Sequence, residues 1–185
     1  NLLTEEMIMR VTAILASPRK SGNCDILIDE AIRGAEENGA EVIKYYLDDL
    51  NMEPCHACGH CGDGIDCITQ DDAVEVIESL LESDNIILAT PIYFGQMTAQ
   101  AKILVDRFYS VFTNPQKSFN GNALLMYTHG MPEGGLNDSI EFINGLFGTL
   151  GWNVTSLDVG EVLEPGDVKE QENKLKEAYE AGKAL

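Results

Sequence analysis

Four of the five cysteines of this chain fall within thirteen residues and could together bind a metal centre. They are spaced C-x2-C-x2-C-x5-C, as Cys55, Cys58, Cys61 and Cys67. Thiolates are the soft ligands that iron–sulfur clusters select, and zinc sites more often pair two separated C-x2-C turns. The spacing therefore predicts a 4Fe-4S cluster. A structural zinc ion, or free or disulfide-paired thiols, are the alternatives.

Two histidines, His56 and His60, lie between these cysteines. An imidazole can replace a thiolate in a zinc site or in a mixed cluster. A histidine in such a loop is more often solvated, and we do not assign either residue as a ligand.

A second candidate site follows the first apolar stretch of the chain. Residues 17–24 read Ser-Pro-Arg-Lys-Ser-Gly-Asn-Cys and lead into a helical pattern. A hydroxyl- and glycine-rich turn before a helix N-terminus can bind phosphate through free N–H groups and the positive end of the helix dipole. Arg19 and Lys20 add positive charge. The alternative is an ordinary solvated turn with Asn23 as the helix cap.

Five short apolar runs alternate with five amphipathic segments along the chain. The runs predict strands at 10–16, 41–47, 85–89, 123–127 and 153–159. Apolar residues at helical spacing predict helices around 27–35, 69–83, 101–112, 140–150 and 167–181, with a helix start at Thr69. The run Asn85–Ala89 has no charge and no alternation, which is typical of a central parallel strand.

This alternation predicts a single α/β domain spanning 1–185, with a doubly wound five-stranded parallel sheet in the order 2-1-3-4-5. The cysteine-rich segment 51–68 is then an insertion after strand two. Ligands of such sheets bind at the carboxyl ends of the strands, at the point where the strand order reverses. Here that point lies between the loops after strands one and three, at 17–24 and 90–95.

The composition excludes some partners. Thirty-one acidic and twelve basic residues give a formal net charge of −19, which opposes binding to nucleic acid or anionic lipid. The chain has no apolar run of the ~20 residues that a membrane span needs, and no basic-then-apolar leader. We therefore expect a cytoplasmic protein whose cysteines are reduced or metal-bound.

Three segments together resemble the flavodoxin-like NADPH-dependent FMN reductase family. They are Ser17–Asn23, Thr90–Phe94, and Lys102 with Asp106–Arg107, and the likeness spans residues 10 to about 160. Within that family, the cysteine run resembles the cluster motif of the iron–sulfur flavoproteins of anaerobic prokaryotes.

The resemblance implies which residues bind FMN. Around the phosphate it implies Ser17, Arg19, Ser21, Gly22, Asn23 and Cys24, and along the ring Pro91, Ile92, Tyr93, Phe94 and Gly95. A third loop would contribute Thr128 and Gly130, while His129 is either part of this loop or a solvated residue. Tyr93 and Phe94 could instead belong to the core. Cys24 departs from the family, which usually has Ser or Thr there, and we expect a neutral thiol that is not a metal ligand.

The resemblance also implies an activity. The protein would be an FMN-dependent oxidoreductase that passes electrons between a 4Fe-4S cluster, supplied by a ferredoxin-like donor, and FMN, and then to a small acceptor such as a quinone or oxygen species. NAD(P)H is the alternative donor. We also expect a homodimer or homotetramer, and an ion pair between Lys102 and Asp106. The alternatives are a cluster-free NAD(P)H-dependent FMN or quinone reductase, and a non-enzymatic flavodoxin-like electron carrier.

Overall fold

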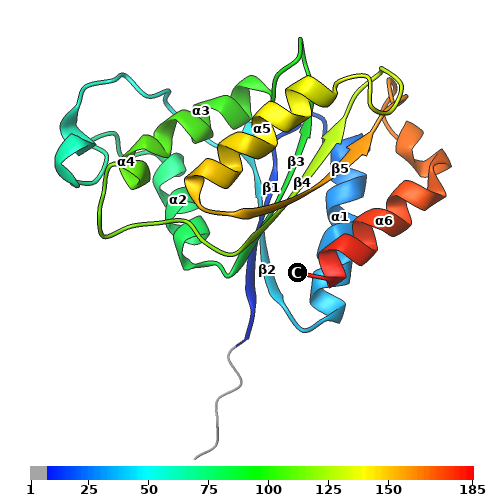
Figure 1. Cartoon of the computed structure of the whole chain (residues 1–185), viewed down its shortest axis with the longest axis horizontal. Coiled ribbons are helices and arrows are strands. Elements are labelled where there is room, and N and C mark those ends of the chain that lie inside the picture. The colour runs from blue at the N-terminus through cyan, green and yellow to red at the C-terminus, as the bar shows by residue number, and fades with distance from the viewer. Residues whose placement is uncertain (1–7) are drawn as a thin grey trace, which may run out of the picture.

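The computed structural model describes residues 8–185 of the chain. Its strands are β1 (Arg10–Leu15), β2 (Glu41–Tyr46), β3 (Asn85–Pro91), β4 (Asn122–Thr128) and β5 (Asn153–Val159). They form one parallel sheet in the order β2-β1-β3-β4-β5 (Figure 1). The predicted fold class and strand order are therefore confirmed.

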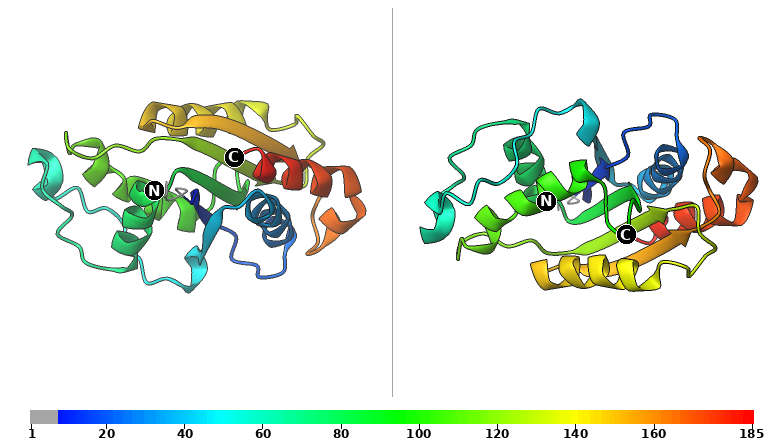
Figure 2. Two further views of the ribbon diagram at one scale, coloured as in Figure 1. Left: turned by 90° about the horizontal axis from the view of Figure 1, so that it is seen from below. Right: turned by 90° about the horizontal axis from the view of Figure 1, so that it is seen from above.

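Helices cover both faces of the sheet (Figures 1 and 2). One face carries α1 (Asn23–Glu37) and α6 (Glu172–Lys183). The other carries α2 (Asp72–Glu82), α3 (Ala99–Arg107), α4 (Tyr109–Phe112) and α5 (Asn137–Leu150). Short 3-10 helices lie at η1 (Leu47–Asp49), η2 (His60–Asp63) and η3 (Asp167–Glu170). In the described residues, no helix is long and apolar enough to cross a bilayer.

The apolar pattern of each strand explains its position in the sheet. All seven residues of β3 are buried, because helices cover both sides of this central strand. The edge strand β2 alternates exposed and half-buried residues along most of its length. The core on the α2–α5 side includes Trp152, whose ring stacks on Phe119 with centroids 4.3 Å apart.

Helices α1 and α6 approach each other through glycines. A Cβ added at Gly34 would lie 2.1 Å from the carbonyl oxygen of Tyr179, and one at Gly182 would lie 1.9 Å from that of Ala31. Both contacts are far below van der Waals distance. The two backbones can therefore come this close only because these residues lack a side chain.

Some helix boundaries differ from the prediction. Helix α2 begins after Asp71, whose carboxylate accepts a hydrogen bond from the Ala73 N–H at 3.1 Å, so Asp71 and not Thr69 is the cap. Gly22, not Asn23, precedes α1. The predicted helix 101–112 is divided at Phe108 into α3 and α4, and the tail is divided into η3 and α6.

Candidate functional site

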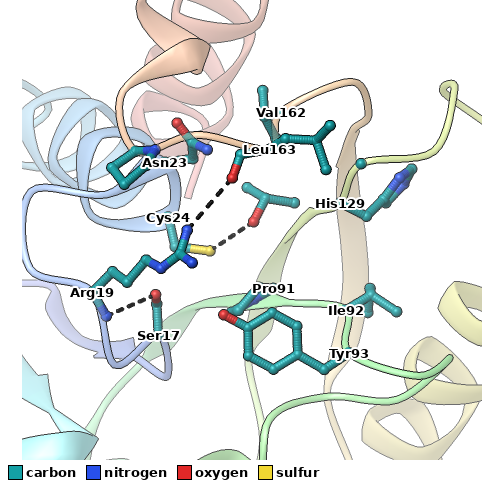
Figure 3. Close-up of a pocket in the computed structure, with 13 residues that line it drawn as sticks. Ser17, Arg19, Asn23, Cys24, Pro91, Ile92, Tyr93, His129, Val162 and Leu163 are labelled. Carbon is teal, nitrogen blue, oxygen red and sulfur yellow. Dashed lines mark hydrogen bonds between the residues drawn. The ribbon is translucent and has the colours of Figure 1, made fainter.

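A cavity of about 240 Å³ opens at the carboxyl ends of β1, β3 and β4, where the strand order reverses (Figure 3). Its walls come from four loops, one after each of β1, β3, β4 and β5. It is lined by Ser17, Arg19, Asn23, Cys24, Pro91, Ile92, Tyr93, Thr128, His129, Gly130, Val162, Leu163 and Pro165. The fold therefore provides a ligand site where a doubly wound sheet is expected to have one.

The loop after β1 presents an uncapped helix end to this cavity. Within the described part of the chain, no side chain caps the first turn of α1. Arg19 adds a guanidinium, which donates to the carbonyl oxygen of Leu163 at 3.5 Å and leaves other N–H groups available. At Gly22 a Cβ would lie 3.0 Å from both the Cβ and the carbonyl oxygen of Arg19. The tight turn, helix dipole and guanidinium fit a phosphate group in this otherwise acidic protein.

A partly buried ion pair lies behind this loop and supports its shape. The Ser21 N–H donates to Asp25 Oδ2 at 2.6 Å, and Ser21 has a left-handed φ of 58°. Lys44 on β2 donates to Asp25 at 2.5 Å and to Asp29 at 2.6 Å. Lys20, expected to add charge to the loop, instead pairs with Asp49 at 2.6 Å. Arg19 is therefore the cation that this loop brings to the cavity.

Cys24 lies at the start of α1 and lines the cavity. Its Sγ lies 3.1 Å from Oγ1 of Thr128 at the end of β4. Burial raises the pKa of the Cys24 thiol to about 12. The side chain is therefore a neutral thiol at physiological pH, and a thiolate that would repel a phosphate dianion is not formed.

The loop after β3 projects two aromatic side chains outward. Tyr93 and Gln96 exchange two backbone hydrogen bonds, and this turn carries Phe94 at a left-handed φ of 49°. Phe94 is fully exposed, and Tyr93 is 45% exposed at the cavity wall. Both residues are outside the core, so an internal packing role for them is wrong.

Two buried threonines join the loops after β1 and β3. Thr98 Oγ1 donates to the carbonyl oxygen of Ala16 at 2.7 Å and accepts from the Ala101 N–H at 3.2 Å. The Thr98 N–H donates to Thr90 Oγ1 at 3.3 Å. Thr98 thus caps α3 and holds the end of β1 against the end of β3. The sequence analysis missed this role, although a Thr before a helical pattern is a cap signal.

His129 follows β4 and is buried, not solvated. Its Nε2 lies 2.6 Å from Oδ1 of Asp158, and its Nδ1 lies 3.1 Å from the carbonyl oxygen of Met131. Asp158 also accepts the Gly134 N–H at 2.8 Å. His129 therefore fixes the loop after β4, and the prediction of a solvated residue is wrong for this side chain.

Nine of the thirteen residues expected to bind the cofactor line the cavity. The other four, which are Ser21, Gly22, Phe94 and Gly95, belong to the same loops without contributing to its wall. Sequence reasoning missed Val162, Leu163 and Pro165, which follow β5. The signal that could have found them is their position in a loop directly after a predicted strand, a loop that begins at Gly160 and contains a proline.

The cysteine segment forms a separate loop that protrudes beyond α4, away from the carboxyl ends of β3 and β4 (Figures 1 and 2). Left-handed residues Ala57, Gly59 and Gly64 reverse its backbone. The end of α4 anchors it, because Thr113 Oγ1 donates to the Cys61 carbonyl at 2.8 Å and Asn114 Nδ2 donates to the Gly64 carbonyl at 2.9 Å.

Arg107 and Asp71 form a buried ion pair at the neck of this loop, 2.8 Å apart. Arg107 also donates to the Glu53 carbonyl at 3.0 Å and to the Thr69 carbonyl at 2.8 Å, so it joins both ends of the loop. Burial alone would raise the pKa of Asp71, but the Arg107 guanidinium and the Glu53 N–H hold it below its usual value.

The four cysteines differ in exposure. Cys55 and Cys58 are exposed, Cys67 is half-buried, and Cys61 is buried. In the part of the chain that the structure describes, no three His, Cys, Asp or Glu side chains stand close enough to share a metal ion. Four thiols on one loop are nevertheless the donor set that a 4Fe-4S cluster requires. The donor chemistry fits a cluster, while the sulfurs are not gathered around one point.

Comparisons with known proteins agree with the fold and identify a family. A family model described as NADPH-dependent FMN reductase matches residues 9–160. An iron-sulfur flavoprotein of Methanosarcina thermophila is 34% identical, with 81% of this chain and 86% of that protein aligned. One of Archaeoglobus fulgidus is 31% identical over 96% of this chain and 79% of its own length. The solved structure of NAD(P)H:quinone oxidoreductase from Methanothermobacter marburgensis superposes with a TM-score of 0.80 at 19% identity and covers 96% of both chains.

Proposed function

The chain belongs to the NADPH-dependent FMN reductase family and is an FMN-dependent oxidoreductase, and from this premise we propose that it is an iron–sulfur flavoprotein. Its FMN would occupy the cavity at the switch point of the sheet. A 4Fe-4S cluster would be bound by Cys55, Cys58, Cys61 and Cys67. The observation that carries the proposal is the presence, in one chain, of a helix N-terminus without a side-chain cap at that cavity and a separate loop with four thiols.

The residues of the cavity fit FMN. The first turn of α1, with Arg19, would bind the phosphate. Pro91, Ile92 and Tyr93 form the wall along which the flavin ring would lie, and the half-exposed Tyr93 leaves that side open to a small substrate. The neutral Cys24 thiol adds no charge beside the phosphate. Bound FMN can exchange two electrons with a hydride donor or one electron at a time with a metal centre.

The electrons would come from a ferredoxin-like protein or from NAD(P)H and would leave to a small acceptor such as a quinone or an oxygen species. The described side chains offer an open flavin edge but no dedicated dinucleotide turn, since the sequence has no G-x-G-x-x-G. Any nicotinamide would therefore bind transiently against the flavin. No nucleophilic side chain is required for such electron transfer.

We further propose that the protein works as a homodimer or homotetramer, in which the cysteine loop of one subunit faces the cavity of another. Within one chain the cysteine loop and the segment after β5, which lines the cavity, lie at opposite ends of the ribbon (Figure 2). Each site also carries exposed apolar side chains. Near the cavity these are Tyr93, Phe94, Met131 and Leu163, and near the cysteine loop they are Ile65, Ile68, Tyr109 and Phe112. Two such surfaces are suited to burial against each other.

The first test is the content of iron, acid-labile sulfide, zinc and flavin in protein purified without oxygen. About four iron and four sulfide per chain are expected, together with flavin absorption bands. Cys58→Ala should abolish the iron and retain the flavin, and Cys24→Ala is the matched control that should retain the iron. Flavin without iron in the anaerobic wild type would refute the cluster and favour an NAD(P)H-dependent FMN or quinone reductase.

A second test addresses the assembly. Sedimentation of the loaded protein should give a dimer or tetramer, and Phe112→Glu should weaken it, whereas the equally exposed Phe142→Glu on α5 should not. A monomeric wild type at micromolar concentration would refute transfer between subunits.

A further inference from the structure

Arg107 has more hydrogen-bonding capacity than the neck of the cysteine loop uses. Its Nη1 donates to Glu53 and Asp71, and its Nη2 donates to Thr69. Its Nε is buried and has no hydrogen-bond partner among the described residues. A buried donor without an acceptor destabilises the fold, because the N–H group has lost its water and gained no other partner. The Arg107 Nε–H is therefore able to donate a hydrogen bond to an acceptor that binds beside it.

Arg107 and Cys67 both line a small cavity of about 90 Å³ between α2 and the end of α3. The other cation of that cavity, Lys117, already pairs with Asp66. Of the four arginines in the sequence, Arg107 alone lines this cavity. The walls of this cavity also include the apolar side chains of Ile77, Leu81 and Val111.

We propose that Arg107 is a positioning residue for the metal ligand Cys67, holding the loop closed with its two outer nitrogens and donating a hydrogen bond to the bound sulfur with Nε. This inference rests on the proposed function, because it concerns a ligand of the proposed cluster. One buried side chain would then link both ends of the loop to the fourth ligand. The fourth cysteine is separated from the third by a five-residue spacer.

Two effects follow from this arrangement. A hydrogen bond to a cluster sulfur and a fixed positive charge both favour the reduced centre, which carries the additional negative charge. Removing them should make the reduction potential more negative. Loss of the link at Cys67 should also let the loop open, so that a chelator reaches the iron faster.

The test compares Arg107→Lys and Arg107→Met with Lys102→Met in anaerobically purified protein. Lys102 lies on the same helix, is exposed and pairs with Asp106, so its replacement removes one positive charge without touching the loop. Both Arg107 variants should keep FMN, release iron to a chelator at least tenfold faster, and have a more negative cluster potential. If the equilibrium constant for reducing the cluster falls tenfold, its reduction potential becomes 59 mV more negative. Lys102→Met should match the wild type in both measurements.

If Arg107→Met fails to fold, a measurement on wild-type protein still tests the proposed hydrogen bond. In protein labelled with ¹⁵N-arginine, pulsed EPR of the reduced cluster should detect a nitrogen coupling that Arg107→Lys abolishes. Two outcomes would overturn the inference and leave the cluster in place. One is wild-type protein that holds iron but shows no such coupling. The other is an Arg107→Lys variant whose rate of iron release stays within twofold of wild type and whose cluster potential stays within about 18 mV, the equivalent of twofold. Wild-type protein without iron would overturn the cluster itself.

Discussion

Replacing Thr98 by Val should loosen the cofactor cavity at the point where the loops after β1 and β3 meet. Valine keeps the shape of the side chain and removes the hydroxyl, which caps α3 and donates to the Ala16 carbonyl. Loss of an N-cap costs about 1 kcal/mol, and a buried carbonyl left without its donor costs about 1–3 kcal/mol. Since Thr98 is 1% exposed and Ala16 is fully buried, water cannot replace the donor. We expect a loss of about 2–4 kcal/mol in the free energy of unfolding.

Urea unfolding of the apoprotein would measure this, with the fluorescence of Trp152, the sole tryptophan, as the signal. Thr98→Ser keeps the hydroxyl and is the control, with an expected loss of about 1 kcal/mol for one methyl group. In Thr98→Val the affinity for FMN should also fall, because Ala16 directly precedes the loop 17–24, which we propose binds the phosphate. A loss below about 0.5 kcal/mol at an unchanged m-value would show that the two bonds do not hold the loops together.

Three further predictions concern other parts of the fold. Because burial raises the pKa of Cys24 to about 12, this thiol should resist iodoacetamide at pH 8 in folded protein, and mass spectrometry showing rapid labelling would contradict it. The pKa of Asp71 is lowered by folding, so its stabilisation is present above the ordinary value near 4 and is lost as the pH falls through the lowered value. Asp71→Asn should therefore cost about 3 kcal/mol in urea unfolding at pH 7 and much less at pH 2, and an equal cost at both would refute the assignment. Gly34→Ala should lower the free energy of unfolding by about 1–3 kcal/mol, because the new methyl group forces α1 away from α6. Gly145→Ala, with no described atom within 4 Å of its Cβ, should raise it by up to about 1 kcal/mol. Calorimetry should therefore give a lower Tm for the first variant and an equal or higher Tm for the second.

The strand order could be predicted from the sequence because local patterns determine it. An uncharged run such as Asn85–Ala89 suits only a strand covered on both faces, and five strand–helix units leave few right-handed topologies. Helix boundaries were less certain. Thr69 and Asp71 are both acceptable caps by residue type, and the buried pairing of Asp71 with Arg107, 36 residues away, decides between them.

The candidate site was predictable where it consists of contiguous loops and not where distant segments complete it. Ser17, Arg19 and Pro91 follow predicted strands and line the cavity as expected. Leu163 and Pro165 belong to a segment that the Asn23 side chain holds beside α1 through hydrogen bonds to residues 164–168, contacts more than 140 residues apart that no local pattern predicts. The exposure of Phe94 likewise depends on a left-handed backbone position that residue type alone disfavours.

The side chain of Asn23 joins the loop 17–24 to the segment 164–168, which follows β5, by hydrogen bonds. Its Oδ1 accepts the N–H groups of Gly166 and Val168 at 2.9 and 3.1 Å, and its Nδ2 donates to the Glu164 carbonyl at 2.9 Å. The side-chain amide of Asn23 therefore binds the segment after β5. Only the backbone N–H of Asn23 remains to donate to an anion. If the loop 17–24 binds the cofactor phosphate as proposed, filling the cavity should slow deuterium uptake at Gly166 and Val168. These two amides would then report cofactor occupancy from positions more than 140 residues along the chain from Asn23.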